Sequence, residues 1–134
     1  NGFEKFASEQ IKIRSFFAPN HTYDLNTFKA LDECGIDNVI DGYGIFPYSY
    51  KNLNFIPQLF YREIMLPFGI QSTQLHINYW KEKDFNKFEK FLRKHKKKIV
   101  SFDNILNKIK SGFFTNSLNF ALKNCIKITR TLKS

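Results

Sequence analysis

Apolar positions in the first 35 residues change their spacing twice, and each change predicts a new element. Residues 3–9 look like the last turns of a helix. Residues 11–17 then carry an apolar run of strand length, which ends at Pro19. From Asp24, a residue type that caps helices, apolar side chains recur at helical spacing as far as Gly35. The pattern therefore predicts a strand followed by a helix.

The middle of the chain alternates short apolar runs with a long irregular stretch. Residues 38–40 predict a short buried strand. Residues 43–70 are rich in aromatic rings and contain three prolines, which predicts a long connection with short extended pieces at 55–56 and 63–66. Residues 71–77 then predict another strand.

The remaining chain continues the alternation of strands and helices. We expect Asp84 to cap a helix with one apolar face, formed by Phe85, Phe88, Phe91 and Leu92. Residues 99–102 predict a strand, and Asp103 begins a short helix that Gly112 ends. A last helix is expected over residues 115–132.

This alternation predicts an α/β fold with mostly parallel strands joined by crossover helices. A parallel sheet with so few strands has open edges, which fits part of a (β/α) barrel better than a finished domain. We expect residues 1–110 to form that partial barrel and residues 111–134 to form a helical tail packed on it. The chain begins with Asn1 rather than Met, so its numbering is expected to start inside a longer reading frame or after processing.

Composition supports a folded chain. The 134 residues are 43% hydrophobic, with 16 Phe and 6 Tyr, so a core is expected and disorder is not. No apolar run reaches the roughly 20 residues that span a bilayer, and no signal peptide is visible, so a cytoplasmic or membrane-peripheral location is expected. Cys34 and Cys125 lie far apart without a CxxC spacing, and we expect two free, half-buried thiols.

The net charge of +9 is concentrated in residues 81–98. The first interpretation is the solvated face of a barrel helix, and contact with an anionic membrane or an anionic glycan is the alternative. Nucleic-acid binding is not expected, because no known motif accompanies the charge. For the last helix, packing on the barrel is preferred to lying on a membrane surface.

Polar residues follow the ends of the predicted strands, where parallel α/β folds bind ligands. They are Pro19, Asn20 and His21 after the first strand, Asp41 and Tyr43 after the second, and His76, Tyr79 and Trp80 at the third. Each has another interpretation: His21 could stabilise a turn, Asp41-Gly42 is a common turn pair, and His76 could be a core histidine. His95, within a lysine run, is expected to be solvated. No HExxH, HxxxH or CxxC motif predicts a metal site.

Four segments, in order, resemble the later motifs of the NodB-like polysaccharide deacetylases. Residues 15–36 resemble the third motif region, in which a strand ends in an Ala-Pro turn and leads into a helix. Residues 39–42 (Val-Ile-Asp-Gly) resemble the next strand, and residues 73–76 (Thr-Gln-Leu-His) the late Leu-His motif. Residues 84–106 resemble the closing helix and strand. The resemblance covers roughly residues 1–110.

This resemblance implies the C-terminal half of a barrel that usually has seven strands. Members of the family are bacterial and other hydrolases of carbohydrate metabolism that remove acetyl groups from N- or O-acetylated sugars. Their divalent metal, commonly zinc, is held by motifs upstream of the third one, and the residues before Pro19 are too few to contain them. We therefore expect no metal in this chain, and zinc only together with an upstream half.

The resemblance also assigns roles to individual residues. His76 matches the general acid towards the leaving amine or alcohol, with Asp41 as the carboxylate that keeps it protonated. Phe17 stands where the family usually has an Arg, and His21 is expected to replace part of that function. The expected substrate-binding residues are Pro19 and Asn20 in the turn that lines the cleft, with Tyr43, Tyr79 and Trp80 as rings that stack on sugars.

Two functions follow as hypotheses. The first is a fragment of a polysaccharide deacetylase-like hydrolase, inactive alone, whose partners are an acetylated oligosaccharide or polysaccharide and the missing N-terminal half. The second is a non-catalytic module that binds glycans or a protein partner through a basic surface with an aromatic rim.

Overall fold

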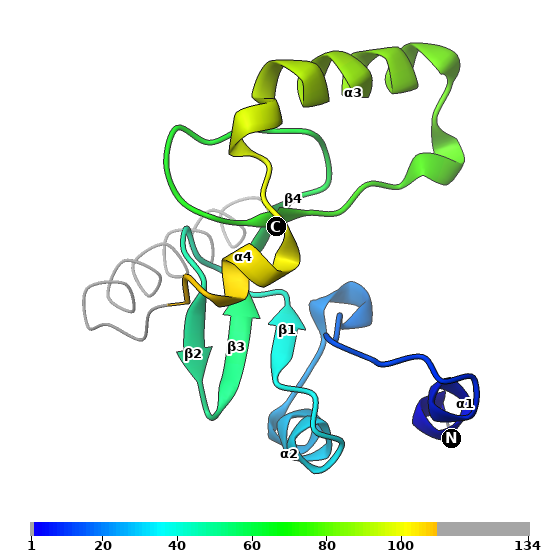
Figure 1. The fold of residues 1–134 in the computed structure, drawn as a ribbon, viewed down its shortest axis with the longest axis vertical. Coiled ribbons are helices and arrows are strands. Elements are labelled where there is room, and N and C mark those ends of the chain that lie inside the picture. The colour runs from blue at the N-terminus through cyan, green and yellow to red at the C-terminus, as the bar shows by residue number, and fades with distance from the viewer. Residues whose placement is uncertain (1, 110–134) are drawn as a thin grey trace, which may run out of the picture.

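A computed structural model describes residues 2–109 of the chain (Figure 1). Single 3-10 turns lie at Pro19–His21, Ile77–Tyr79 and Lys96–Lys98. The helices and strands are, in chain order, α1 (Gly2–Ser8), α2 (Leu25–Glu33), β1 (Asn38–Ile40), β2 (Tyr48–Tyr50), β3 (Leu53–Ile56), β4 (Gln58–Phe60), β5 (Ser72–Thr73), α3 (Glu82–His95) and α4 (Phe102–Leu106).

The main sheet has three strands in the order β1-β3-β2. β1 runs parallel to β3 with Val39 opposite Phe55, whereas β2 and β3 form an antiparallel hairpin. Phe16 adds a parallel bridge on the other side of Val39. It is held by hydrogen bonds from the Phe16 N–H to the Asn38 carbonyl and from the Ile40 N–H to the Phe16 carbonyl, both 2.8 Å. A strand was predicted over residues 11–17, but Phe16 is the only one of these residues that pairs with a neighbouring strand.

β3 is followed directly by β4, with Pro57 between them. Proline has no N–H to donate and interrupts a ladder of hydrogen bonds. Beyond it, β4 pairs in parallel with β5 in a second sheet, with Gln58 opposite Ser72. Phe16, β1 and β3 are thus parallel neighbours in chain order, and so are β4 and β5, whereas β2 lies antiparallel beside β3. The described residues form two small sheets and no closed barrel, and the partial barrel stays a prediction.

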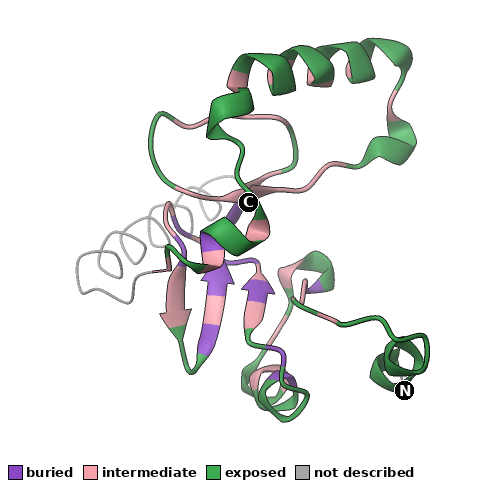
Figure 2. Ribbon diagram, in the orientation of Figure 1, coloured by how far each residue is buried: buried purple, intermediate pink, exposed green. Residues whose placement is uncertain are grey.

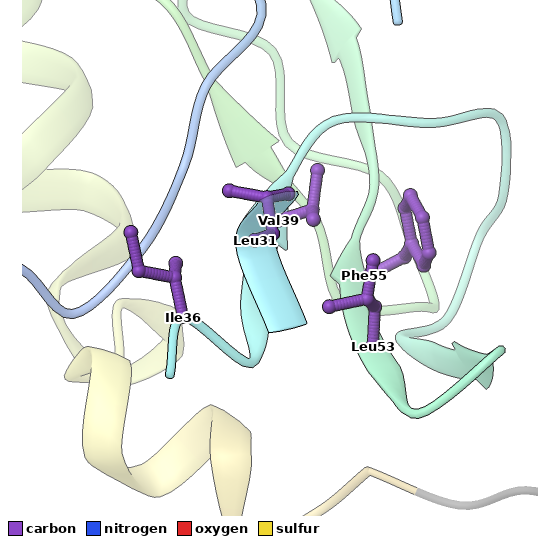
Figure 3. Close-up of a cluster of buried hydrophobic side chains, with 5 residues drawn as sticks. All are labelled: Leu31, Ile36, Val39, Leu53 and Phe55. Atoms are coloured by element: carbon purple, nitrogen blue, oxygen red, sulfur yellow. The ribbon is translucent and has the colours of Figure 1, made fainter. Parts of the chain in front are cut away.

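The core lies between α2 and the main sheet (Figure 3). Val39 and Phe55, the paired residues of β1 and β3, are 0% and 2% exposed, and Leu31 of α2 packs against them. Burying a side chain such as Leu31 contributes about 1.5–3 kcal/mol. Figure 2 shows that burial is concentrated in this sheet, whereas α1 and α3 are mostly exposed.

The predicted helix after Asp24 is confirmed, and its ends have local causes. The Asp24 carboxylate accepts a hydrogen bond from the Thr27 N–H at 2.8 Å, and the Thr27 hydroxyl completes a capping box with the Asp24 N–H. At the other end, Gly35 has a φ of +65°, a left-handed conformation that glycine adopts without steric cost. β1 matches the predicted strand at 38–40.

The predicted strand at 99–102 is wrong. Ile99 and Val100 are 48% and 40% exposed and lie in irregular chain, and α4 begins at Phe102. The Ser101 hydroxyl accepts a hydrogen bond from the Asn104 N–H at 3.2 Å. A side chain that caps the following turn commits the backbone to a helix, and this outweighs the β-propensity of Ile99 and Val100.

Other predicted boundaries also need correction. α3 begins at Glu82, before Asp84, whose carboxylate accepts from the Lys81 N–H at 2.9 Å rather than capping the helix itself. The strand predicted over 71–77 is reduced to β5, and no strand forms at 63–66.

Two further predictions concern the cysteines and the tail. Cys34 is free and exposed rather than half-buried. Cys125 and the predicted tail over residues 111–134 lie outside the described residues. Between residues 2 and 109, no helix has the length and hydropathy needed to cross a bilayer.

Candidate acid–base site

An imidazole–carboxylate pair lies at the end of β1. His21 Nδ1 is 2.7 Å from Asp41 Oδ1, and the Asp41 side chain is only 4% exposed. The same oxygen accepts a hydrogen bond from the Gly42 N–H at 2.5 Å. Asp41 Oδ2 is buried and has no hydrogen-bond partner within the described part of the chain. An ionised Asp41 accepts from the Nδ1–H of His21, which leaves Nε2 of the neutral ring as an acceptor.

The turn before α2 brings His21 to Asp41. Pro19 begins a single 3-10 turn, and both Asn20 and His21 have left-handed φ angles, of +54° and +56°. The Thr22 hydroxyl donates a 2.7 Å hydrogen bond to the Pro19 carbonyl, and this fixes the exit of the turn. His21 does more than stabilise the turn, because its ring also contacts Asp41 at the end of β1.

Phe17 stands at the position where the resembled family has an Arg. Its ring packs edge-on against the His21 ring, with centroids 5.8 Å apart. The contact is apolar and brings no positive charge to Asp41. The partner of this carboxylate is His21, and the replacement of the family's Arg by His21 stays a prediction.

Two partly buried tyrosines, Tyr23 and Tyr48, lie close enough to Asp41 for its charge to affect them. Burial, followed by the charges of Asp41 and Tyr43, raises the pKa of Tyr23 from 10.0 to about 12. Burial also raises the pKa of Tyr48 above its ordinary value, with Tyr23 and Asp41 adding to the shift. Both phenols therefore stay protonated over the physiological range.

The Asp41-Gly42 pair is more than a turn signal. Gly42 has a φ of +97°, and a Cβ built there would lie 2.6 Å from the Tyr48 hydroxyl oxygen. Only glycine combines this conformation with this close approach. The glycine thus lets the chain turn directly after Asp41 while its N–H holds the carboxylate.

Tyr61 connects the two histidines. Its hydroxyl is hydrogen-bonded to His21 Nε2, and its ring stacks on the exposed ring of His76, with centroids 6.4 Å apart. The prediction that Asp41 serves as the partner of His76 is not what the structure shows, because the carboxylate pairs with His21. Tyr61 was not predicted; the only signal was its place in the aromatic-rich stretch of residues 43–70.

The predicted substrate-binding residues separate into two groups. Pro19 and Asn20 are exposed beside His21, and Tyr43 is half-buried close enough to Tyr23 to affect its pKa. Tyr79 is 84% exposed. Trp80 packs edge-on against two rings of α3 rather than beside His21, with centroids 5.2 Å from Phe85 and 5.3 Å from Phe88.

The site residues do not fit a metal. Between residues 2 and 109, no group of three or more His, Cys, Asp or Glu side chains could hold an ion. His21 and Asp41 bind one another, and the third residue of this cluster is a tyrosine. The zinc that the resemblance implies would need its ligands from elsewhere, and no step below is assigned to a metal.

No family model, curated protein or solved structure matches this chain. The likeness to NodB-like deacetylases rests on the motif residues alone.

Proposed function

We propose that this chain is the C-terminal part of a polysaccharide deacetylase-like hydrolase, which removes acetyl groups from N- or O-acetylated sugars. The observation that carries the proposal is the 2.7 Å pair between His21 and the buried Asp41 at the end of a parallel strand. Hydrolysis of an amide or ester needs groups that move protons at the reacting carbonyl and the leaving group. His21, Tyr61 and His76 provide such groups in one continuous set of contacts.

The proposed roles follow from these contacts. Asp41 fixes the orientation of the His21 ring, and His21 in turn orients the Tyr61 hydroxyl. His76 is exposed, so it can reach a sugar and donate its proton to the leaving amine or alcohol. The exposed ring of Tyr61 lies beside His76 and offers an apolar face on which a sugar can stack.

In this proposal the chain alone binds an acetylated sugar but does not hydrolyse it. NMR titration with chitotetraose, an N-acetylated probe, and with acetylated xylo-oligosaccharides, an O-acetylated probe, tests the binding. We expect at least one probe to shift the ring signals of His21 and His76, and neither to shift those of His95, which packs against Phe91 on α3. Absence of shifts at both site histidines, or release of acetate by the purified chain, contradicts the proposal.

A non-catalytic glycan-binding module is the second candidate. It is favoured by the exposed rings of Tyr61 and Tyr79, which are 53% and 84% exposed. The codons upstream of Asn1 distinguish the two functions. An Asp-Asp pair and an H-x-x-x-H motif there support the hydrolase, and an upstream frame without them supports the binding module.

A further inference from the structure

A cavity of about 550 Å³ lies away from the acid–base site, against α3 and the chain after β4. Its walls are mainly apolar. They are formed by Ile64, Met65, Leu66, Phe88, Phe91 and Ile105, among others. The volume falls within the roughly 300–1,000 Å³ of small-molecule sites, which are typically apolar with a few polar groups.

Residues 71–76, which contain β5, contribute different side chains to the cavity and to the acid–base site. Gln71, Thr73 and Leu75 line the cavity. Gln74 instead accepts a 3.2 Å hydrogen bond from Gln58, and His76 stacks on Tyr61. Gln74, His76 and Tyr61 do not line the cavity, so a ligand in the cavity does not touch the acid–base site.

The chain that forms one wall is fixed at both ends. The Ile70 N–H donates a 2.7 Å hydrogen bond to the Ile45 carbonyl, and Gly69 has a φ of +96° where a Cβ would collide with Ile45. At the other end, Glu63 forms an ion pair with Lys87 of α3. One end of the wall is therefore tied to α3 and the other to Ile45, so the cavity lies between fixed elements.

The charge on the lining is positive. Lys97, Lys98 and Lys108 belong to it, and they are exposed. The acidic residue in the lining is Glu63, whose charge is already paired with Lys87. Within residues 2–109 none of these three lysines forms an ion pair. An apolar interior beside such ammonium groups complements a molecule with an apolar chain and an anionic head.

We propose that this cavity binds a single-chain anionic amphiphile of the fatty-acid type. The acyl chain occupies the apolar interior, and the carboxylate lies beside Lys97 and Lys98. This site is independent of the proposed deacetylase function, since none of the residues assigned to that function lines the cavity.

The test uses the full chain and cis-parinaric acid, a fluorescent C18 carboxylate, below its micelle concentration. We expect saturable binding that the K97E/K98E double variant weakens at least tenfold. The K94E/K96E variant is a matched control, because it changes the net charge equally at exposed residues that do not line the cavity. Equal losses in both variants would show that binding follows the net charge of the helix, and would overturn the proposal.

A second variant tests the apolar interior. Met65→Trp fills part of the cavity and is expected to weaken parinarate binding while the circular dichroism spectrum is kept. Dodecyltrimethylammonium, which has the same kind of chain with a cationic head, should not displace the probe. Unchanged affinity in Met65→Trp, or binding to phosphatidylglycerol vesicles without binding to monomeric fatty acid, would contradict the cavity site.

Discussion

Asp41 holds the ring of His21, twenty residues earlier in the chain, through a 2.7 Å contact between Oδ1 and Nδ1. The contact joins the turn before α2 to the end of β1, which are otherwise connected through the core of α2 and the sheet. One carboxylate therefore both fixes a local turn, through Gly42, and positions a side chain from another element.

Replacement of Asp41 should destabilise the fold. Asp41→Ala removes the acceptor for the Gly42 N–H and for His21, and a buried donor left without a partner costs about 1–3 kcal/mol. We expect a lower midpoint of urea unfolding at pH 7. Asp37→Ala, an exposed position just before β1, should change the free energy of unfolding by no more than about 0.5 kcal/mol. Equal effects would show that the Asp41 contacts add nothing.

Gly42→Ala should cost more than Gly35→Ala, although both glycines have positive φ angles. The left-handed conformation costs any L-residue about 1–2 kcal/mol. At Gly42 the new Cβ also meets the Tyr48 hydroxyl at 2.6 Å, whereas at Gly35 it meets no atom within 4 Å. Overpacking of this kind adds about 1–3 kcal/mol.

The cause of the extra cost at Gly42 can be isolated in a double-mutant cycle. Tyr48→Phe removes the oxygen that the Cβ would meet, so the difference between the two glycine variants should shrink in that background. Chemical denaturation of the four variants measures it. A difference that persists in the Tyr48→Phe background would place the strain elsewhere.

Tyr23 should make stability depend on alkaline pH. Its pKa is raised from 10.0 in the unfolded chain to about 12 in the folded protein, so the folded state holds the phenol proton more tightly. Its contribution is complete below pH 10 and is lost as the pH rises towards 12. Unfolding experiments between pH 8 and 11 should therefore show a decline above pH 10 that is smaller in Tyr23→Phe. An identical decline in both proteins would contradict the assignment.

The ion pair between Glu63 and Lys87 should stabilise the cavity wall at neutral pH but not in acid. The hydrogen bond from Lys87 is the largest cause that lowers the pKa of Glu63 below its ordinary value of 4.5. A carboxylate with a lowered folded pKa contributes stability above its unfolded pKa and loses it as the pH falls through the folded pKa. Glu63→Gln should cost about 1 kcal/mol or less at pH 7, since Lys87 is exposed.

Thermal unfolding at two pH values measures this effect. The difference between Glu63→Gln and the unchanged protein should shrink as the pH falls below 4.5 and disappear once the pH is below the lowered folded pKa of Glu63. Glu89→Gln, which breaks the exposed pair with Arg93 within α3, serves as the control. Glu89 does not line the cavity, so Glu89→Gln should leave the affinity for parinarate unchanged.

The sequence predicted elements whose causes are local. α2 follows from the cap at Asp24, the apolar spacing that includes Leu31, and the glycine at Gly35. The hairpin of β2 and β3 was missed inside residues 43–70, because its turn residues Lys51 and Asn52 are both left-handed without a glycine to signal it. A turn of this kind is set by the pairing of the strands around it.

Only part of the candidate site was predicted, because only part of it follows from local sequence signals. His21, Asp41 and His76 were found because each follows or ends a predicted strand. Their connection was not predicted, since Tyr61 reaches His21 across forty residues and belongs to no motif. The partner of Asp41 was assigned to the wrong histidine, because order along the chain does not fix which ring a carboxylate meets.

The alternation of side chains along residues 71–76 also limits how this part of the chain can change in length. Where successive side chains alternate between two faces, a shift of one residue exchanges those faces. Insertion or deletion of a single residue within it would turn Leu75 towards Tyr61 and His76 towards the apolar cavity. Only an insertion or deletion of an even number of residues keeps the cavity-lining side chains on one side and His76 on the other. Insertions of two residues should therefore be tolerated better than insertions of one.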